Sequence, residues 1–336
     1  MNNFAKDVIK NMETKKLLND KSVQASILIA AIVISSSLGY TVGVKASTAK
    51  NTTQAQAAQV KDPAQELEQK VLPSGGVTLP VVWGDMGTRL VSSGILEADK
   101  FKAIYENRGQ FTDEYNKLLT ATDNGKLKIT KDNSGYILNL LWAFGLANKN
   151  EILEKGEMMD KTYGGAQNFA STGGWTIAKG NTMDHYSKHV MVSLTADQQA
   201  LVDKVSRGIF RPCCGNSVHF PDCNHGMAML GLLELMASQG VSEQDMWSTA
   251  LTVNSFWFPD NYTTIAVYMQ SKGTDWKNVN PQEMLSAAYS SSRGYANIAS
   301  QVTQPSAQSA GGSGCSLGDA GAPAPQAQSG QTGCGL

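Results

Sequence analysis

The sequence predicts a mostly α-helical protein, with a single helical domain behind an N-terminal transmembrane helix and a minor β-hairpin as its only β-structure. Three observations lead to this prediction. One long uncharged stretch stands near the N-terminus, apolar segments bounded by helix-capping residues fill the middle, and few short segments have the composition of strands. The 336 residues suffice for one large domain or two modest ones.

The uncharged stretch predicts the membrane anchor. Residues 22–44, SVQASILIAAIVISSSLGYTVGV, form a run of 23 residues without charge, and a helix needs about 20 residues to cross a bilayer. Lysines crowd the preceding segment 1–21, and positive flanks stay cytoplasmic. We therefore expect a single-pass cell-membrane protein with its C-terminal domain outside the cytoplasm. A cleaved signal peptide, cut near Val44 and Ala46, is the alternative.

Two further segments lack apolar periodicity. Residues 45–62 are rich in Ala, Gln and Thr and predict a flexible linker, and residues 304–336 predict a disordered Gly/Ala/Gln-rich tail. The extracytoplasmic helical domain is then 63–303. The net charge of −1 and the lack of a basic block exclude nucleic acid as an expected partner.

Helix-start and helix-stop residues divide this domain. Asp62 followed by Pro63 opens the first helix, and Thr195 with Gln198 has the spacing of a capping box. Further helices are expected at 96–109, 111–125, 133–150, 194–209, 224–240, 242–258, 259–273 and 280–290, with Gly109, Gly125 and Gly240 as ends and Ser242 and Asn280 as caps. The segment 224–240 is apolar nearly all round and is the predicted central helix.

Strand candidates are short and few. Residues 76–82, 126–130 and 175–178 have strand-like composition. Because helical segments far outnumber strand candidates, the sequence predicts a mostly α-helical fold.

Seven potential metal ligands crowd into residues 185–225. All four histidines of the chain and three of its five cysteines lie in this window: Cys213, Cys214, Cys223, His185, His189, His219 and His225. Structural histidines scattered at random would not gather in an eighth of the chain. We therefore predict that the chemistry of the protein sits here.

Thiolates and imidazoles together suit copper or zinc, with iron as a third choice, rather than calcium or magnesium. Cys213, Cys214, Cys223 and His225 would satisfy tetrahedral zinc. His219, or the pair of His185 and His189, could join this site or form a second one; on a helix the spacing of that pair would place both rings on one face. Nearby methionines favour copper, although methionine more often fills apolar cores: Met183, Met191, Met227 and Met229.

Cys223 and His225 stand directly before the predicted central helix. A helix N-terminus favours a thiolate over a thiol, and Asp222 could orient an imidazole ligand by a hydrogen bond without binding the ion itself. No catalytic residue and no organic cofactor can be assigned from sequence, and no protein partner is indicated.

Two alternatives use the same cysteines. The chain could be a thiol–disulfide redox protein with Cys223 as the attacking thiol, although it lacks a C-x-x-C motif. It could also be a non-catalytic scaffold with a structural disulfide. Cys315 and Cys334, in the predicted tail, could reach the site and deliver metal or exchange a disulfide.

Overall fold

The computed structural model describes residues 62–302. The predicted cytoplasmic segment 1–21, the anchor 22–44, nearly all of the linker 45–62 and the tail 304–336 lie outside the described residues. Within the described part, no helix combines the length and the apolar character that a bilayer crossing requires. The membrane anchor therefore stays a prediction.

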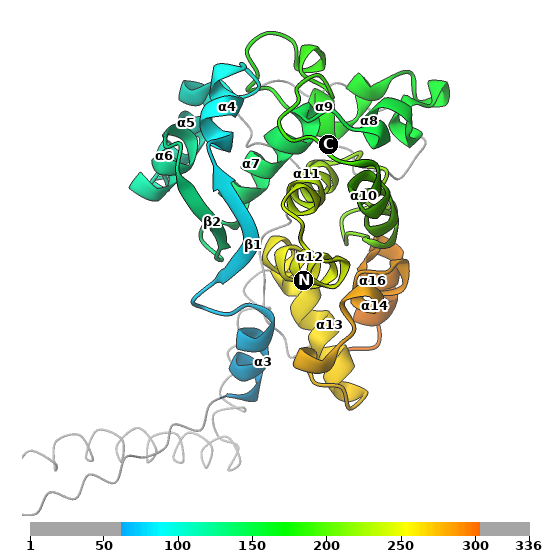
Figure 1. The fold of residues 1–336 in the computed structure, drawn as a ribbon. Coiled ribbons are helices and arrows are strands. Elements are labelled where there is room, and N and C mark those ends of the chain that lie inside the picture. Colours follow the sequence, from blue (N-terminus) through cyan, green and yellow to red (C-terminus); the bar gives the residue numbers. More distant parts are fainter. Residues whose placement is uncertain (1–61, 303–336) are drawn as a thin grey trace, which may run out of the picture. The chain divides into compact units, whose positions relative to one another are not determined.

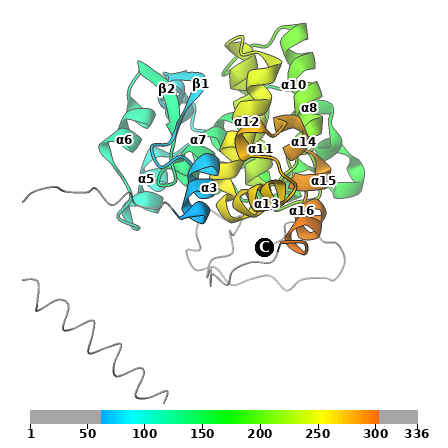
Figure 2. The same cartoon turned by 90° about the horizontal axis from the view of Figure 1, so that it is seen from below.

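The described residues form a mostly helical unit with one two-stranded antiparallel sheet, which confirms the predicted class (Figure 1). Viewed from below, the sheet lies with α5 and α6 on one side of α7 and α11, and the later helices lie on the other (Figure 2). The elements are α3 Pro63–Val71, β1 Val77–Gly84, α4 Met86–Ser92, α5 Ala98–Glu106, α6 Asp113–Thr120, β2 Asn124–Ile129, α7 Ser134–Ala147, α8 Glu151–Lys155, α9 Ala170–Gly173, α10 Ala196–Gly208, α11 Asn224–Ser238, α12 Glu243–Trp257, α13 Pro259–Ser271, α14 Pro281–Met284, α15 Ala287–Ser290 and α16 Ser292–Ala299, with short 3₁₀ turns between them.

The two strands do not form the predicted hairpin. β1 and β2 pair through Val77 with Ile129 and Gly84 with Asn124, but α4, α5 and α6 intervene in the chain. The predicted strand at 175–178 is also wrong, because this segment forms a turn. The Trp175 ring is buried there, and its Nε1–H donates to the carbonyl of Ile95 at 2.8 Å.

Local capping signals are confirmed. Asp62 caps α3, and Thr195 and Gln198 make both bonds of a capping box at α10. Ser242 caps α12, and Asn280 caps the short α14. Two helix ends differ from prediction. The helix α6 stops at Thr120, so that Gly125 lies in β2, and the predicted helix at 280–290 breaks into α14 and α15.

Helices α7 and α11 form the centre of the core, as the apolar sequence of both predicts. Their backbones approach closely at Gly145 and Gly231: a Cβ on Gly145 would lie 2.2 Å from the carbonyl oxygen of Met227, and one on Gly231 would lie 2.6 Å from that of Leu141. Only glycine permits this approach. The pair fixes the position of α11, whose N-terminus carries two of the predicted ligands.

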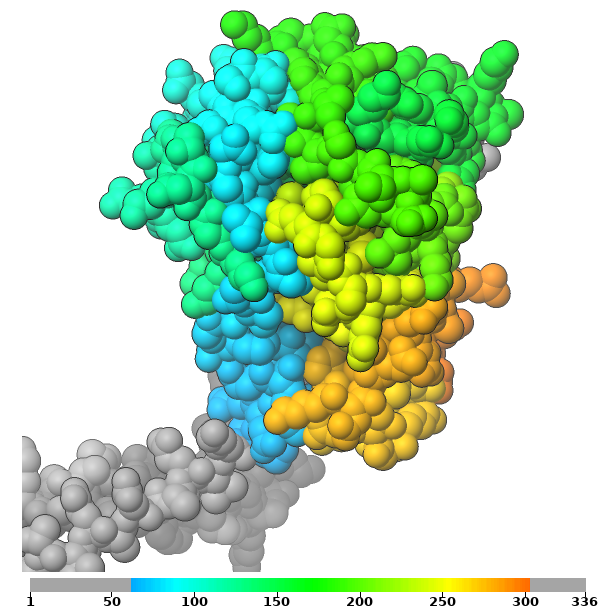
Figure 3. All heavy atoms as spheres, in the orientation of Figure 1, coloured from blue at the N-terminus to red at the C-terminus, as the bar shows by residue number. Residues whose placement is uncertain are grey.

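The first described helix, α3, also contacts the last third of the described residues. Helix α3 packs against α13, and Lys70 forms an ion pair with Asp275 at 2.8 Å. Figure 3 shows these two parts of the chain side by side on one face. Contacts between the first helix and the last third of the described residues therefore hold these two parts of the unit together.

A buried acid lies in the second half of α11. Glu234 is 0 % exposed, accepts a hydrogen bond from Asn148 Nδ2 at 2.7 Å on Oε2, and has no partner on Oε1 among residues 62–302. Burial raises the pKa of Glu234 well above its usual value, although the amides of Asn148 and Asn150 act in the opposite direction. The carboxyl therefore stays protonated at a pH where an exposed glutamate is ionised.

This burial predicts a pH-dependent stability. A raised folded pKa means that stability is complete below the unfolded pKa and is lost as pH rises toward the folded one, at up to about 1.4 kcal/mol per pH unit. Glu234→Gln removes this loss. Urea unfolding at pH 5 and pH 8 should show a smaller decline for the variant than for the wild type.

The control is Glu106→Gln, which changes an exposed glutamate at the end of α5. That variant should keep the decline of the wild type. A decline equally steep in Glu234→Gln would show that Glu234 does not titrate on unfolding.

Candidate metal centre

A closed loop between α10 and α11 carries the first two cysteines. An isolated antiparallel bridge joins Phe210 to Ser217, and the N–H of Val218 donates to the carbonyl of Ile209 at 2.8 Å. The loop therefore folds back and presents Cys213 and Cys214 toward the start of α11.

The third cysteine begins α11. Cys223 is the N-cap residue, and its Sγ accepts from the N–H of Gly226 at 3.4 Å. The sequence places this thiol before an apolar helix, and the structure gives it a helix N-terminus, where backbone donors favour the thiolate.

The three sulfur atoms form a triangle. The Sγ–Sγ distances are 3.1 Å between Cys213 and Cys214, 3.3 Å between Cys214 and Cys223, and 3.9 Å between Cys213 and Cys223. All three exceed the S–S bond length of about 2.05 Å. Zinc bound to thiolates at about 2.3 Å would hold tetrahedral sulfurs about 3.8 Å apart. Small shifts would therefore let all three sulfurs face one ion.

Two further side chains approach the triangle. Ligand atoms of Cys213, Cys223 and His225 all lie within 4.8 Å of one another, and so do those of Cys214, Asp222 and Cys223. The buried His225 ring packs 4.4 Å from the Phe258 ring, centroid to centroid, and its Nδ1 has no hydrogen-bond partner among the described residues. Aromatic packing thus orients an imidazole beside the sulfurs.

A buried arginine stands behind the sulfurs. The Arg211 side chain is 0 % exposed, and its Nη2 pairs with Asp222 Oδ1 at 2.8 Å. Its Nη1 donates to the Asn216 carbonyl at 3.2 Å, and Asn216 Nδ2 donates to Asp222 Oδ2 at 2.7 Å. The third residue of α11, Gly226, leaves room for it: a Cβ there would lie 2.8 Å from the guanidinium.

The charges of this group influence each other. The hydrogen bond with Cys213 lowers the pKa of Cys223, and Arg211 and His225 lower it further against Cys214 and burial. Burial opposes the charge of Arg211, yet Cys223, Cys214 and Asp222 raise its pKa well above its usual value. Burial raises the pKa of Asp222 to about 6, and Cys223 adds to this effect. The arrangement therefore favours the thiolate of Cys223.

The arginine was missed from sequence, although a cation two residues before adjacent cysteines is a usable signal. A second missed group borders Cys213: the Tyr262 hydroxyl lies 2.7 Å from Ser290 Oγ and accepts from Asn254 Nδ2 at 3.1 Å. Burial raises the pKa of Tyr262, and the nearby Cys213 contributes. No sequence pattern connects these distant positions.

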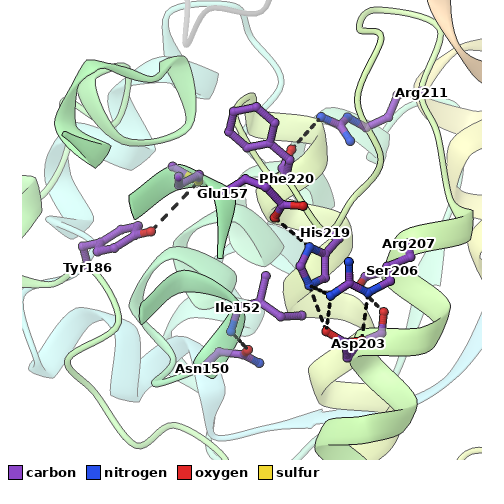
Figure 4. Close-up of polar contacts among 11 residues, drawn as sticks. Asn150, Ile152, Glu157, Tyr186, Asp203, Ser206, Arg207, Arg211, His219 and Phe220 are labelled. Atoms are coloured by element: carbon purple, nitrogen blue, oxygen red, sulfur yellow. Dashed lines mark hydrogen bonds and ion pairs between the residues drawn. The ribbon is translucent and has the colours of Figure 1, made fainter. Parts of the chain in front are cut away.

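His219 lies in a different polar cluster (Figure 4). Its Nδ1 is 2.7 Å from Glu157 Oε2, and its Nε2 is 2.9 Å from Asp203 Oδ1 and 2.8 Å from Arg207 Nη2. The two carboxylates lie at opposite nitrogens of the ring, so they cannot share one ion with it. Among the described residues, neither group of ligands at the cysteines includes His219.

His185 and His189 meet each other but do not lie on an α-helix. The 3₁₀ turn Thr182–Asp184 ends before His185, and the backbone of Ser187 has a φ of 52°. His185 Nδ1 lies 3.0 Å from His189 Nε2. Within the described chain, neither ring belongs to the two ligand groups at the cysteines.

Comparison with protein-family models, with curated protein sequences and with solved structures finds no match for this chain. Its function is therefore inferred from the side chains described above and from their geometry. The sulfur triangle and its buried cation are the features that need a functional explanation.

The role of Arg211 can be tested in the metal-free, reduced protein. Arg211→Met removes the cation beside the sulfurs, so the thiolate titration followed by ultraviolet absorbance should shift to higher pH by about one unit or more. Arg211→Lys keeps a charge and should shift it less. Arg108→Met, at an exposed site after α5, is the control. An unchanged titration in Arg211→Met would refute the electrostatic role.

Proposed function

We propose that this chain is a membrane-anchored extracytoplasmic protein that binds one soft transition-metal ion, copper or zinc. Cys213, Cys214 and Cys223 would supply three sulfurs, and His225 the fourth ligand. The observation that carries the proposal is the triangle of three sulfurs, with all Sγ–Sγ distances between 3.1 and 3.9 Å, at the N-terminus of α11.

Charge compensation supports a bound cation. If all three cysteines ionise, three thiolates and Asp222 stand against the single positive charge of Arg211, and two of the cysteines are buried. Uncompensated charge is costly to bury. A metal ion compensates it directly, and otherwise the thiols must keep their protons. Metal binding should therefore release protons and strengthen as the pH rises.

His225 is a better fourth ligand than Asp222. Both carboxylate oxygens of Asp222 already accept hydrogen bonds, from Arg211 and from Asn216. The Nδ1 atom of His225, by contrast, is buried without a partner in the described part of the chain. We assign Asp222 the task of holding Arg211 in place, which is a positioning role rather than that of a ligand.

The donor set favours binding over catalysis. Catalytic zinc sites keep one coordination position open for water, whereas four protein ligands close the site. Thiolates bind Cu⁺, Zn²⁺ and iron, so metal analysis of the purified protein identifies the ion. The extracytoplasmic location rests on the uncharged stretch 22–44 and the lysines before it.

A thiol–disulfide function is the second candidate. The Sγ atoms of Cys214 and Cys223 are 3.3 Å apart, and the pKa of Cys223 is lowered chiefly by its contact with Cys213. In that case, oxidation of two thiols to a disulfide would pass two electrons and two protons to an acceptor. A structural disulfide would use the same approach of the sulfurs.

Metal analysis separates these candidates. The full-length chain, purified in detergent without chelator, should contain about one copper or zinc ion per chain with its core thiols reduced. Cys223→Ser should weaken the metal affinity at least ~tenfold. The matched control is the double variant Cys315→Ser, Cys334→Ser, which should keep the ion.

The opposite results are distinct. A metal-free protein with one easily reduced disulfide would favour the redox function, and a disulfide that resists reduction would favour the scaffold. Circular dichroism of Cys223→Ser is needed, because a lost structural metal can itself unfold the loop.

A further inference from the structure

A second group of nitrogen ligands lies apart from the sulfurs. The rings of His185 and His189 are nearly parallel, with centroids 5.2 Å apart and planes inclined by 18°. One nitrogen of each ring, Nδ1 of His185 and Nε2 of His189, faces the other at 3.0 Å. Two imidazoles thus converge on one point.

The tautomer of His185 follows from its other contact. Its Nε2 lies 3.0 Å from the carbonyl oxygen of Lys179, and a carbonyl can only accept a hydrogen bond. The neutral ring therefore carries its proton on Nε2 and a lone pair on Nδ1, directed at His189. A backbone carbonyl is one of the common outer partners that orient a metal-binding imidazole in this way.

The backbone between the rings is strained. Ser187 is the one non-glycine residue with positive φ in the described chain, at 52°. Its N–H donates to the carbonyl of Leu146 at 2.9 Å, and its Oγ accepts from the N–H of Asn150 at 3.1 Å. Strain of this kind persists only where surrounding contacts enforce it, and it gathers at functional sites.

His189 is also fixed and remains accessible. Its N–H donates to the carbonyl of Ala147 at 2.9 Å, and its carbonyl accepts from the N–H of Lys149 at 2.8 Å. The side chain is partly exposed, whereas His185 is buried. An ion can therefore reach the pair from solvent.

We propose that His185 and His189 form a second, separate metal site for a borderline divalent ion such as Zn²⁺, with water completing the coordination. At a Zn–N distance of about 2.0–2.1 Å, tetrahedral nitrogens stand about 3.3 Å apart, so the rings need to separate slightly and to tilt until both nitrogens face the ion. Binding moves the proton of His189 from Nε2 to Nδ1. Without an ion, the Nε2–H of His189 donates to His185 Nδ1.

This site does not depend on the proposed function. It uses imidazoles alone and shares no residue with the sulfur site. The two sites can therefore be removed by substitution and measured one at a time.

Imidazole ¹⁵N NMR tests the proposal. The full-length chain has only four histidines, so histidine labelling resolves each ring during a titration with Zn²⁺. We expect His185 Nδ1 and His189 Nε2 to shift together to metal-bound values, while both nitrogens of His219 stay unchanged. His189→Gln should weaken the Zn²⁺ affinity of the histidine pair at least ~tenfold, and His219→Gln should not.

The outcomes are independent of the cysteines. If Cys223→Ser abolishes the sulfur site and the two imidazole signals still shift, the histidine pair binds the ion by itself. If His189 keeps its Nε2 proton in the wild type under a large excess of Zn²⁺, the proposal is overturned, whether or not any variant folds.

Discussion

A guanidinium buried beside three sulfurs is the interaction on which the rest of the site depends. Arg211 is 0 % exposed, so its charge must be met inside the protein. Asp222 meets part of it at 2.8 Å, and the interactions of the guanidinium with Cys223 and Cys214 also raise the pKa of Arg211. The loop between α10 and α11 closes around this cation through Asn216 and Asp222, and the same loop carries Cys213 and Cys214.

The scaffold supplies the rigidity that this arrangement needs. Helix α11 begins at the site and runs through the core, where the glycine contact at Gly145 and Gly231 fixes it against α7. The same helix thus presents Cys223 and His225 at its N-terminus. Gly226 leaves space for the guanidinium, so the backbone of α11 also permits the electrostatic contacts at the site.

Features that depend on neighbouring residues could be predicted from the sequence, whereas contacts between residues far apart in the chain could not. The capping box at Thr195 and the apolar helix at 224–240 depend on neighbouring residues, and the structure has both. The pairing of β1 with β2 across three helices, and the carboxylates around His219, depend on the tertiary fold. The approach of the three sulfurs follows the crowding of cysteines in the sequence, whereas the cation behind them required the structure.

X-ray absorption at the zinc K-edge tests the central claim most directly. The full-length chain would be loaded with less than one equivalent of zinc, so that the strongest site fills first. The account predicts three sulfur neighbours at about 2.3 Å and one nitrogen at about 2.0 Å. A first shell made only of nitrogen and oxygen atoms would contradict it, because the sulfurs of Cys213, Cys214 and Cys223 would then not share the ion.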